Sequence, residues 1–232
     1  MGVWVMALAV ILAACSNNPS PTPFVAPSEA PAVASPTSEA PSTDAPAGWT
    51  RVEGEGFSMT LPEGWRAMAP SDINDSGIFE QLREANPNAA GAIDQAEAAL
   101  ASGQISFFAF DPGERTAQTG FATNVNVIAL EDVGGTSVEE ATEELAGGIE
   151  QVTPRERIET STITLPGGEA GVVRYVWTLE LPNGGSTELA GTQYIIFDGD
   201  RAFVITLTGI EEFAAEDAPR WDQVAESFRV EE

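Results

Sequence analysis

Polar and apolar residues alternate along several stretches after residue 48, and this period of two predicts β-strands. In the longest stretch, 170–181, the residues that share the apolar face are Val173, Tyr175, Trp177, Leu179 and Leu181. The intervening Arg174, Thr178 and Glu180 are expected to point away from that face. Further strands are predicted at 57–61, 105–110, 125–130, 158–165, 189–197 and 202–208. Short turns such as Asp198-Gly199 separate the later strands, so the pattern predicts a largely antiparallel meander.

Helical periodicity brackets these strands. Ser137-Val-Glu-Glu140 has the sequence of a capping box, followed by apolar residues at helical spacing at Ala141, Leu145 and Ile149. The C-terminal stretch places Trp221, Val224, Ala225 and Phe228 on one stripe. An alanine-rich, acidic stretch from Asp72 to Gly103 predicts two helices broken at Pro87, as a helical insertion over one end of the sheet. The fold class predicted is α+β, an antiparallel sheet with helices packed on it.

The N-terminus has a different sequence pattern from the rest of the chain. Val3 to Leu12 is an uninterrupted apolar run of about half the length that a membrane-spanning helix needs. It leads into Leu12-Ala13-Ala14-Cys15, which resembles a lipobox, the site at which bacterial lipoproteins are cleaved before a diacylated cysteine. Two acyl chains suffice for stable anchoring, where one is marginal. No basic residue precedes the run in Met1-Gly2, so either the start codon lies upstream or the signal is a weak one.

A segment rich in Pro, Ser, Thr and Ala follows the cysteine, and it contains too few large apolar residues to form a core. The domain organisation predicted is a signal peptide at 1–14, a lipidated cysteine with a disordered linker at 15–47, and one globular domain at 48–232. The alternative, a buried apolar helix with an incidental cysteine, does not explain the linker. We therefore expect a lipoprotein on the outer face of the cell membrane.

Composition excludes several chemistries. The chain has 36 acidic residues, 10 basic residues and no histidine, and all ten basic residues are arginine. Histidine bases and ligands, lysine Schiff bases and the phosphate-loop lysine are therefore absent. The formal net charge of −26 would repel nucleic acid. Because Cys15 is the only cysteine, no disulfide can form within the chain. No cofactor is expected.

Three motifs resemble those of the PsbP-like (Mog/PsbP-type) fold and its lipoprotein relatives, the DcrB-like and LpqN-like proteins. They are the strand closed by Leu61-Pro-Glu-Gly-Trp65, the strand Asn124-Val-Asn-Val127, and the ending Tyr194…Gly199…Phe203-Val-Ile-Thr-Leu-Thr208 before a helix with Ser227-Phe228. They occur in the expected order over most of residues 49–230. The resemblance implies an α/β/α sandwich around an antiparallel sheet, and binding or accessory roles with no shared catalytic residues.

The residues of two candidate sites are also explained by ordinary structural roles. Asp72, Asn74 and Ser76 have the spacing of the first half of a calcium loop, but Arg83 occupies the position of the bidentate glutamate, and capping of a helix by Asp75 or Ser76 explains the same residues. Trp65 and Tyr194 could line a ligand cleft, although Trp49, Trp65, Trp177 and Trp221 all fall at positions expected to face the core.

Three functions remain open. The first is a non-enzymatic lipoprotein that binds an envelope protein or a small apolar ligand. The second is an extracytoplasmic, glycosidase-like hydrolase with two carboxylates, for which acidic pairs such as Glu139-Glu140, Glu143-Glu144 and Glu211-Glu212 are available, although solvated faces explain them as well. The third is a structural accessory subunit, which the sequence does not distinguish from the first.

Overall fold

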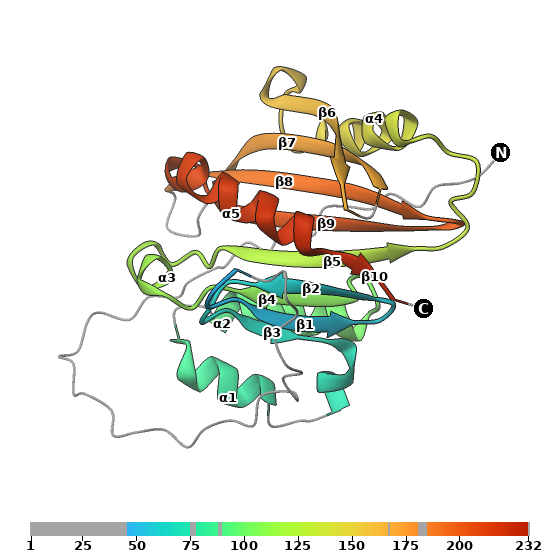
Figure 1. The fold of residues 1–232 in the computed structure, drawn as a ribbon. Coiled ribbons are helices and arrows are strands. Elements are labelled where there is room, and N and C mark those ends of the chain that lie inside the picture. Colours follow the sequence, from blue (N-terminus) through green and yellow to red (C-terminus); the bar gives the residue numbers. More distant parts are fainter. Residues whose placement is uncertain (1–45, 75–77, 88–89, 167, 181–184, 232) are drawn as a thin grey trace.

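The computed structural model describes residues 46–74, 78–87, 90–166, 168–180 and 185–231. Within these ranges, a seven-stranded antiparallel sheet of order β3-β4-β5-β9-β8-β7-β6 forms the middle of the molecule (Figure 1). Its strands are β3 (Arg66–Met68), β4 (Phe107–Phe110), β5 (Asn124–Leu130), β6 (Ile158–Leu165), β7 (Gly168–Glu180), β8 (Ser186–Asp198) and β9 (Arg201–Ile210). A smaller sheet of order β1-β2-β10 consists of β1 (Thr50–Gly54), β2 (Phe57–Leu61) and β10 (Arg229–Val230).

The helices are α1 (Ile78–Ala85), α2 (Ala90–Ala101), α3 (Glu114–Thr119), α4 (Val138–Ile149) and α5 (Ala214–Ser227). Short 3-10 turns lie at Pro70–Asn74, Arg155–Arg157 and Glu211–Phe213. Helices α1 and α2 are the pair predicted on either side of Pro87. None of the helices in the described ranges has the length and apolar character needed to cross a bilayer.

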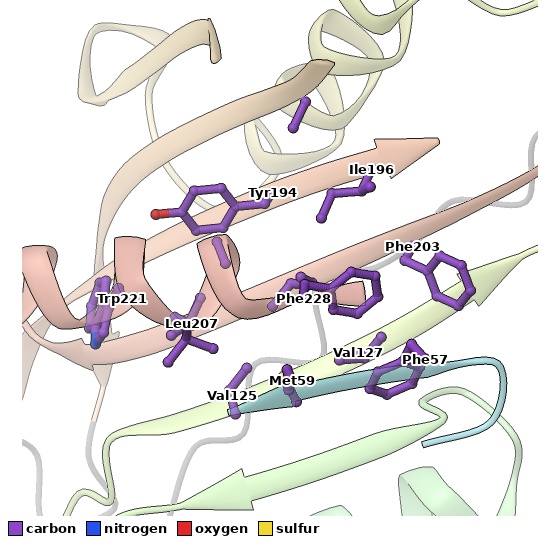
Figure 2. Packing of buried hydrophobic residues seen from close by; sticks show 14 of the residues in the cluster. Phe57, Met59, Val125, Val127, Tyr194, Ile196, Phe203, Leu207, Trp221 and Phe228 are labelled. Atoms are coloured by element: carbon purple, nitrogen blue, oxygen red, sulfur yellow. The ribbon is translucent and has the colours of Figure 1, made fainter. Parts of the chain in front are cut away.

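One face of the large sheet is covered by α5 and the small sheet. Figure 2 shows side chains of β5, β8 and β9 pointing toward Phe57 and Met59 of β2 and toward Trp221 and Phe228. Phe57 is fully buried; its ring stacks on Phe228 at 5.1 Å and meets Phe107 and Phe203 edge-on, both at 5.8 Å. We call the buried cluster that contains these residues the front core. Its members are Phe57, Met59, Leu61, Phe107, Ala109, Val125, Val127, Leu165, Ala170, Val172, Ala190, Tyr194, Ile196, Phe203, Ile205, Leu207, Trp221, Val224, Ala225 and Phe228.

The opposite face is covered by α2 and α4, which occupy different strands. Helix α2 packs near β4, with Ile93 and Leu100 against Phe108 and Phe110. Helix α4 packs on β6, β7 and β8, and its Ala146 and Ile149 belong to a cluster with Tyr175, Trp177 and Leu189. The large sheet is thus buried on both faces. The α+β class and the sandwich arrangement are confirmed, with the small sheet as part of one outer layer.

The second face of β7 is only partly exposed. Arg174, Thr178 and Glu180 point away from the apolar face as predicted, and Thr178 and Glu180 are exposed. Ala170 and Val172 on the same face are nevertheless fully buried in the front core, and Val176 packs against it. Arg174 on the same face contacts Asp222 of α5. The second face of β7 is thus packed at its start and exposed at its end.

The start of α4 follows the predicted capping box. Ser137 Oγ accepts a hydrogen bond from the Glu140 backbone N–H, and Glu140 Oε2 accepts one from the Ser137 backbone N–H, both at 3.2 Å. Two of the N–H groups that a helix start leaves without partners are thereby satisfied.

An ion-pair network joins α3 to α5. Asp217, only 2% exposed, lies 2.9 Å from Arg115 Nη1 and 3.7 Å from Arg220 Nη1. Arg115 also pairs with Glu216 at 2.6 Å and lies over the ring of Phe213. Because a buried carboxylate is costly unless it is paired, these arginines account for the charge at this position.

Candidate functional site

Polar side chains occupy the centre of the sheet face that α2 and α4 cover. We call this group the polar centre; its members are Asn124 and Asn126 of β5, Gln193 of β8, and Thr206 and Thr208 of β9. Thr206 lies directly opposite both Asn126 and Gln193, and Asn124 lies opposite Thr208, so the five side chains share one face. Their exposed fractions are 9% or less.

Apolar clusters flank the polar centre on both sides. On the side toward β3, Phe108 and Phe110 of β4 lie directly opposite Asn126 and Asn124. On the side toward β6, Tyr175 of β7 lies on the same face of the sheet. Between α3 and β5, Phe121 belongs to the cluster under α4 and Ala122 to the cluster under α2. Asn124 Nδ2 donates to the Ala122 carbonyl at 2.9 Å. The segment that joins α3 to β5 therefore contacts both the cluster under α4 and the cluster under α2, at one end of the polar centre.

Tyr175 lies flat against the sheet because Gly191 is opposite it. A Cβ atom on Gly191 would lie 2.5 Å from Tyr175 Cζ, so any larger residue would displace the ring. The Gln193 side chain lies beside the Tyr175 hydroxyl. Burial raises the pKa of Tyr175 far above its ordinary value, and the Gln193 side chain lowers it by less. The phenol therefore stays neutral at physiological pH.

Two buried polar atoms beside Tyr175 have no partner among the described residues. They are Gln193 Oε1 and the indole Nε1 of Trp177, whose ring stacks on Tyr175 at 5.2 Å. Exchanging the amide nitrogen and oxygen of Gln193 would change the unpartnered acceptor into an unpartnered donor without satisfying it. An unsatisfied buried polar group costs about 1–3 kcal/mol. The fold thus retains a polar group where an apolar one would be more stable.

The side chains of the polar centre can donate and accept hydrogen bonds, but they cannot act as a general base or an activated nucleophile. Amides and aliphatic hydroxyls neither gain nor lose a proton near neutral pH, and Tyr175 remains protonated. A general base or an activated nucleophile needs a titratable partner, which the five residues do not contain. The arrangement is suited to holding a neighbouring segment, as Asn124 does with the Ala122 carbonyl.

Replacing Gln193 with leucine is expected to leave the free energy of unfolding unchanged or to raise it by about 1 kcal/mol. The substitution keeps most of the side-chain volume, and removal of the unpartnered buried acceptor offsets the loss of the interaction between the Gln193 amide and the Tyr175 hydroxyl. Urea denaturation of the domain would measure this. Replacing Leu189, an apolar neighbour on the same strand, with alanine should instead cost about 2–5 kcal/mol. A Gln193→Leu variant destabilised by more than about 1 kcal/mol would mean that the amide stabilises the fold.

Tyr194 belongs to the front core, on the other face of the sheet. Its ring is fully buried, and its hydroxyl donates to Asp222 Oδ1 at 2.5 Å, the same oxygen that lies 3.2 Å from Arg174 Nη2. Burial, and then Asp222, raise the pKa of Tyr194 strongly. Trp65 is half-buried against the same core. A ligand site lined by Trp65 and Tyr194 stays a prediction; its ligand would compete with Asp222 for the Tyr194 hydroxyl.

The calcium-loop candidate is only partly within the described residues. Asp72 Oδ2 accepts a hydrogen bond from the Ala69 backbone N–H at 2.7 Å, and Asn74 ends the same 3-10 turn. Ser76 and Asp75 lie outside the described residues. In the part of the chain that the structure describes, no three His, Cys, Asp or Glu side chains gather as metal ligands would. The Asp72 carboxylate is engaged with the backbone.

The lipobox residues Leu12, Ala13 and Ala14 and the lipidation candidate Cys15 also lie outside the described residues. The acidic pairs considered for hydrolysis are exposed, namely Glu139, Glu140, Glu143, Glu144, Glu211 and Glu212. Among the described side chains, the only buried carboxylate is that of Asp217, which arginines hold on two sides. The described carboxylates thus do not include a desolvated, unpaired acid such as glycosidases use.

Sequence reasoning missed the polar centre, although a signal was present. Polar residues alternate with apolar ones in Asn124-Val-Asn-Val127 and in Thr206-Leu-Thr208. Such alternation normally indicates a solvated face. Here the neighbouring strands and two helices cover that face, which only the tertiary structure reveals.

The arrangement defines a class of fold, an α+β sandwich with a central antiparallel sheet. No family model and no curated protein matches the sequence. Among solved structures, the chain is similar to cyanobacterial PsbP (CyanoP) of Synechocystis sp. PCC 6803, with 12% identity and a TM-score of 0.46 over 83% of this chain and 98% of CyanoP. It is also similar to LpqN of Mycobacterium tuberculosis, involved in cell envelope biogenesis, with 12% identity and a TM-score of 0.44 over 76% and 83% of the two chains.

A third similar structure is the Ran-binding protein Mog1p of Saccharomyces cerevisiae, with 14% identity and a TM-score of 0.40 over 75% of this chain and 90% of Mog1p. Structures of PsbP and Mog1p type are thus among those that the chain is similar to, as the three sequence motifs led us to expect. Similarity at this level concerns the course of the chain and carries no function from one protein to another.

Proposed function

We propose that this protein is a lipid-anchored, extracytoplasmic lipoprotein whose folded domain binds a partner and has no enzymatic activity. The observation that carries the binding role is the chemistry of the polar side chains that the fold buries together. In the polar centre they are neutral amides and hydroxyls, and the buried Asp217 is neutralised by arginine. Such groups recognise and position; they do not transfer protons.

The anchor is supported by the sequence before the domain. A short apolar run, two small residues and Cys15 come in the order that lipid attachment requires, and the linker of about thirty residues would span roughly 30 Å on average. The linker joins the domain beside β1, where Trp49 packs against the front core. The polar centre lies on the opposite face of the large sheet, which α2 and α4 cover.

Replacing Cys15 with alanine is expected to abolish incorporation of a fatty-acid label and to leave residues 1–14 attached. The reason is that the thiol is the only group able to form the thioether to the lipid, and cleavage follows lipidation. Labelling cells with an alkyne fatty acid, followed by gel migration, would measure both effects. The matched control is Ser16→Ala, which keeps the thiol and should label and mature as the unaltered protein does. Equal labelling of the Cys15→Ala variant would contradict the anchor.

Binding is tested separately by crosslinking and affinity capture of the intact lipoprotein in its native envelope. We expect capture of a defined envelope protein or a small apolar ligand. Capture of neither, together with turnover of a glycan from a panel, would favour the carboxylate-dependent hydrolase instead.

A further inference from the structure

Strand β6 forms one edge of the large sheet, at the top of the view in Figure 1. It pairs with β7 over eight consecutive residues, Ile158 to Leu165, without a bulge in the register. Among the described strands β7 is its only neighbour. The backbone N–H and C=O groups on its outer side are therefore available to another strand.

This edge lacks the features that usually protect an exposed strand. The eight residues contain one charge, Glu159, and neither proline nor glycine. Four of the others are Thr160, Ser161, Thr162 and Thr164, and threonine favours extended backbone. Proteins normally shorten, charge or bend their edge strands to prevent pairing with other chains.

The other sheet edges in the described ranges are protected in those ways. Strand β3, the opposite edge of the large sheet, has only three residues, and β10 has two. Strand β1 has five residues, which include Arg51, Glu53 and Gly54. The contrast singles out β6 as the edge suited to accept a strand.

The charges beside β6 indicate what kind of strand it would accept. Helix α4 packs on β6, and Thr160 Oγ1 donates to Glu143 Oε1 of α4 at 3.1 Å. Arg155 pairs with Glu143 and Glu150. On α4, in the turn before β6 and on β6 itself, the exposed carboxylates without an ion pair to a described arginine are Glu139, Glu140, Glu144, Glu156 and Glu159. Arg174 of β7 lies directly opposite Glu159, but its ion pair is with Asp222. The edge is thus nearly neutral itself and is bordered by negative charge.

A second copy of this chain fits such an edge poorly. Pairing β6 with β6 would bring the acidic faces of two α4 helices together, on chains that each carry a formal net charge of −26. A strand that carries lysine or arginine would instead gain from these carboxylates. We therefore propose that the outer edge of β6 binds an extended, basic segment of a partner protein as an added strand. This inference rests on the proposed binding function.

The test uses the full-length protein in detergent and an eight-residue peptide of alternating threonine and lysine, with both ends blocked. We expect the peptide to bind and to slow hydrogen exchange at the β6 amides. The same peptide with glutamate in place of lysine should bind at least about tenfold more weakly, which corresponds to about 1.4 kcal/mol. A lysine peptide with alternate backbone amides N-methylated should fail to bind, because strand addition needs its N–H groups.

Two matched variants separate strand addition from charge attraction. Thr162→Lys places a charge at the exposed middle of β6 and should weaken binding of the lysine peptide about tenfold or more. Thr178→Lys adds the same charge at an exposed position of β7 beyond the β6 pairing, and should change binding less than about threefold.

Equal binding of the N-methylated peptide, or equal weakening by both variants, would overturn the inference. So would a dimer in analytical ultracentrifugation that Thr162→Lys converts to a monomer, because the occupant would then be a second copy. If the native partner is captured equally by the unaltered protein and by Thr162→Lys, the edge is not the binding surface, and the proposed function stands without it.

Discussion

Replacing Phe57 with alanine is expected to lower the free energy of unfolding by about 3–5 kcal/mol. The side chain is fully buried, and its ring contacts Phe107 of β4, Phe203 of β9 and Phe228 after α5. Its removal leaves a cavity and loses aromatic contacts, each worth about 0.5–1.5 kcal/mol beyond area burial. Phe57 thus joins the small sheet, the large sheet and the C-terminal segment (Figure 2).

Urea denaturation followed by tryptophan fluorescence would measure the loss. Phe197→Ala provides the matched control, because Phe197 is half-buried at the edge of another cluster and should cost about half as much. Equal costs for the two variants would contradict the view that the front core holds the two sheets together.

The second large effect is expected from Gly171→Ala in β7, with a loss of about 3 kcal/mol or more. A Cβ atom at this position would lie 1.9 Å from Thr142 Oγ1 of α4 and 2.8 Å from Ile195 Cγ2 of β8. Neither distance is compatible with van der Waals contact, so the Thr142 and Ile195 side chains, and α4 with them, would have to shift. Here the glycine is required by the close approach of α4 to β7.

The double variant Gly171→Ala with Thr142→Ala should recover part of this loss, since it removes the nearest clashing atom and leaves Ile195. Thermal or urea unfolding of both single variants and the double variant gives the coupling directly. Gly147→Ala is the control for alanine in place of glycine; it lies in α4 with no atom within 4 Å of its Cβ position and should stabilise by about 0.5–1 kcal/mol. Additive effects in the double variant would contradict the clash.

The sequence predicted the strands and helices well where the pattern was local. The capping box at Ser137 and Glu140 lies within four residues, and the β6 to β9 strands follow one another through short turns. The small sheet was not predicted as a unit because β10 has two residues and pairs with β2 at the other end of the chain. Its contacts, such as Glu231 with Arg51 and Ser58, join residues more than 170 positions apart.

The candidate sites also divide into those that depend on neighbouring residues and those that the tertiary structure assembles. Lipid attachment at Cys15 is a prediction that rests on neighbouring residues alone. The polar centre could not be predicted, because Asn126, Thr206 and Gln193 come from three strands and their burial depends on α2 and α4. Tyr194 was considered as a ligand contact, and its hydrogen bond to Asp222 depends on where α5 lies on the sheet.

The central claim is that a lipid on Cys15 anchors a binding domain outside the cell. The most direct measurement is the mass of the N-terminal peptide of the protein extracted from membranes with detergent. We expect a mature chain that begins at Cys15 and carries a diacylglyceryl group on its sulfur. A mature chain that begins elsewhere, or one in which Cys15 keeps a free thiol, would contradict it.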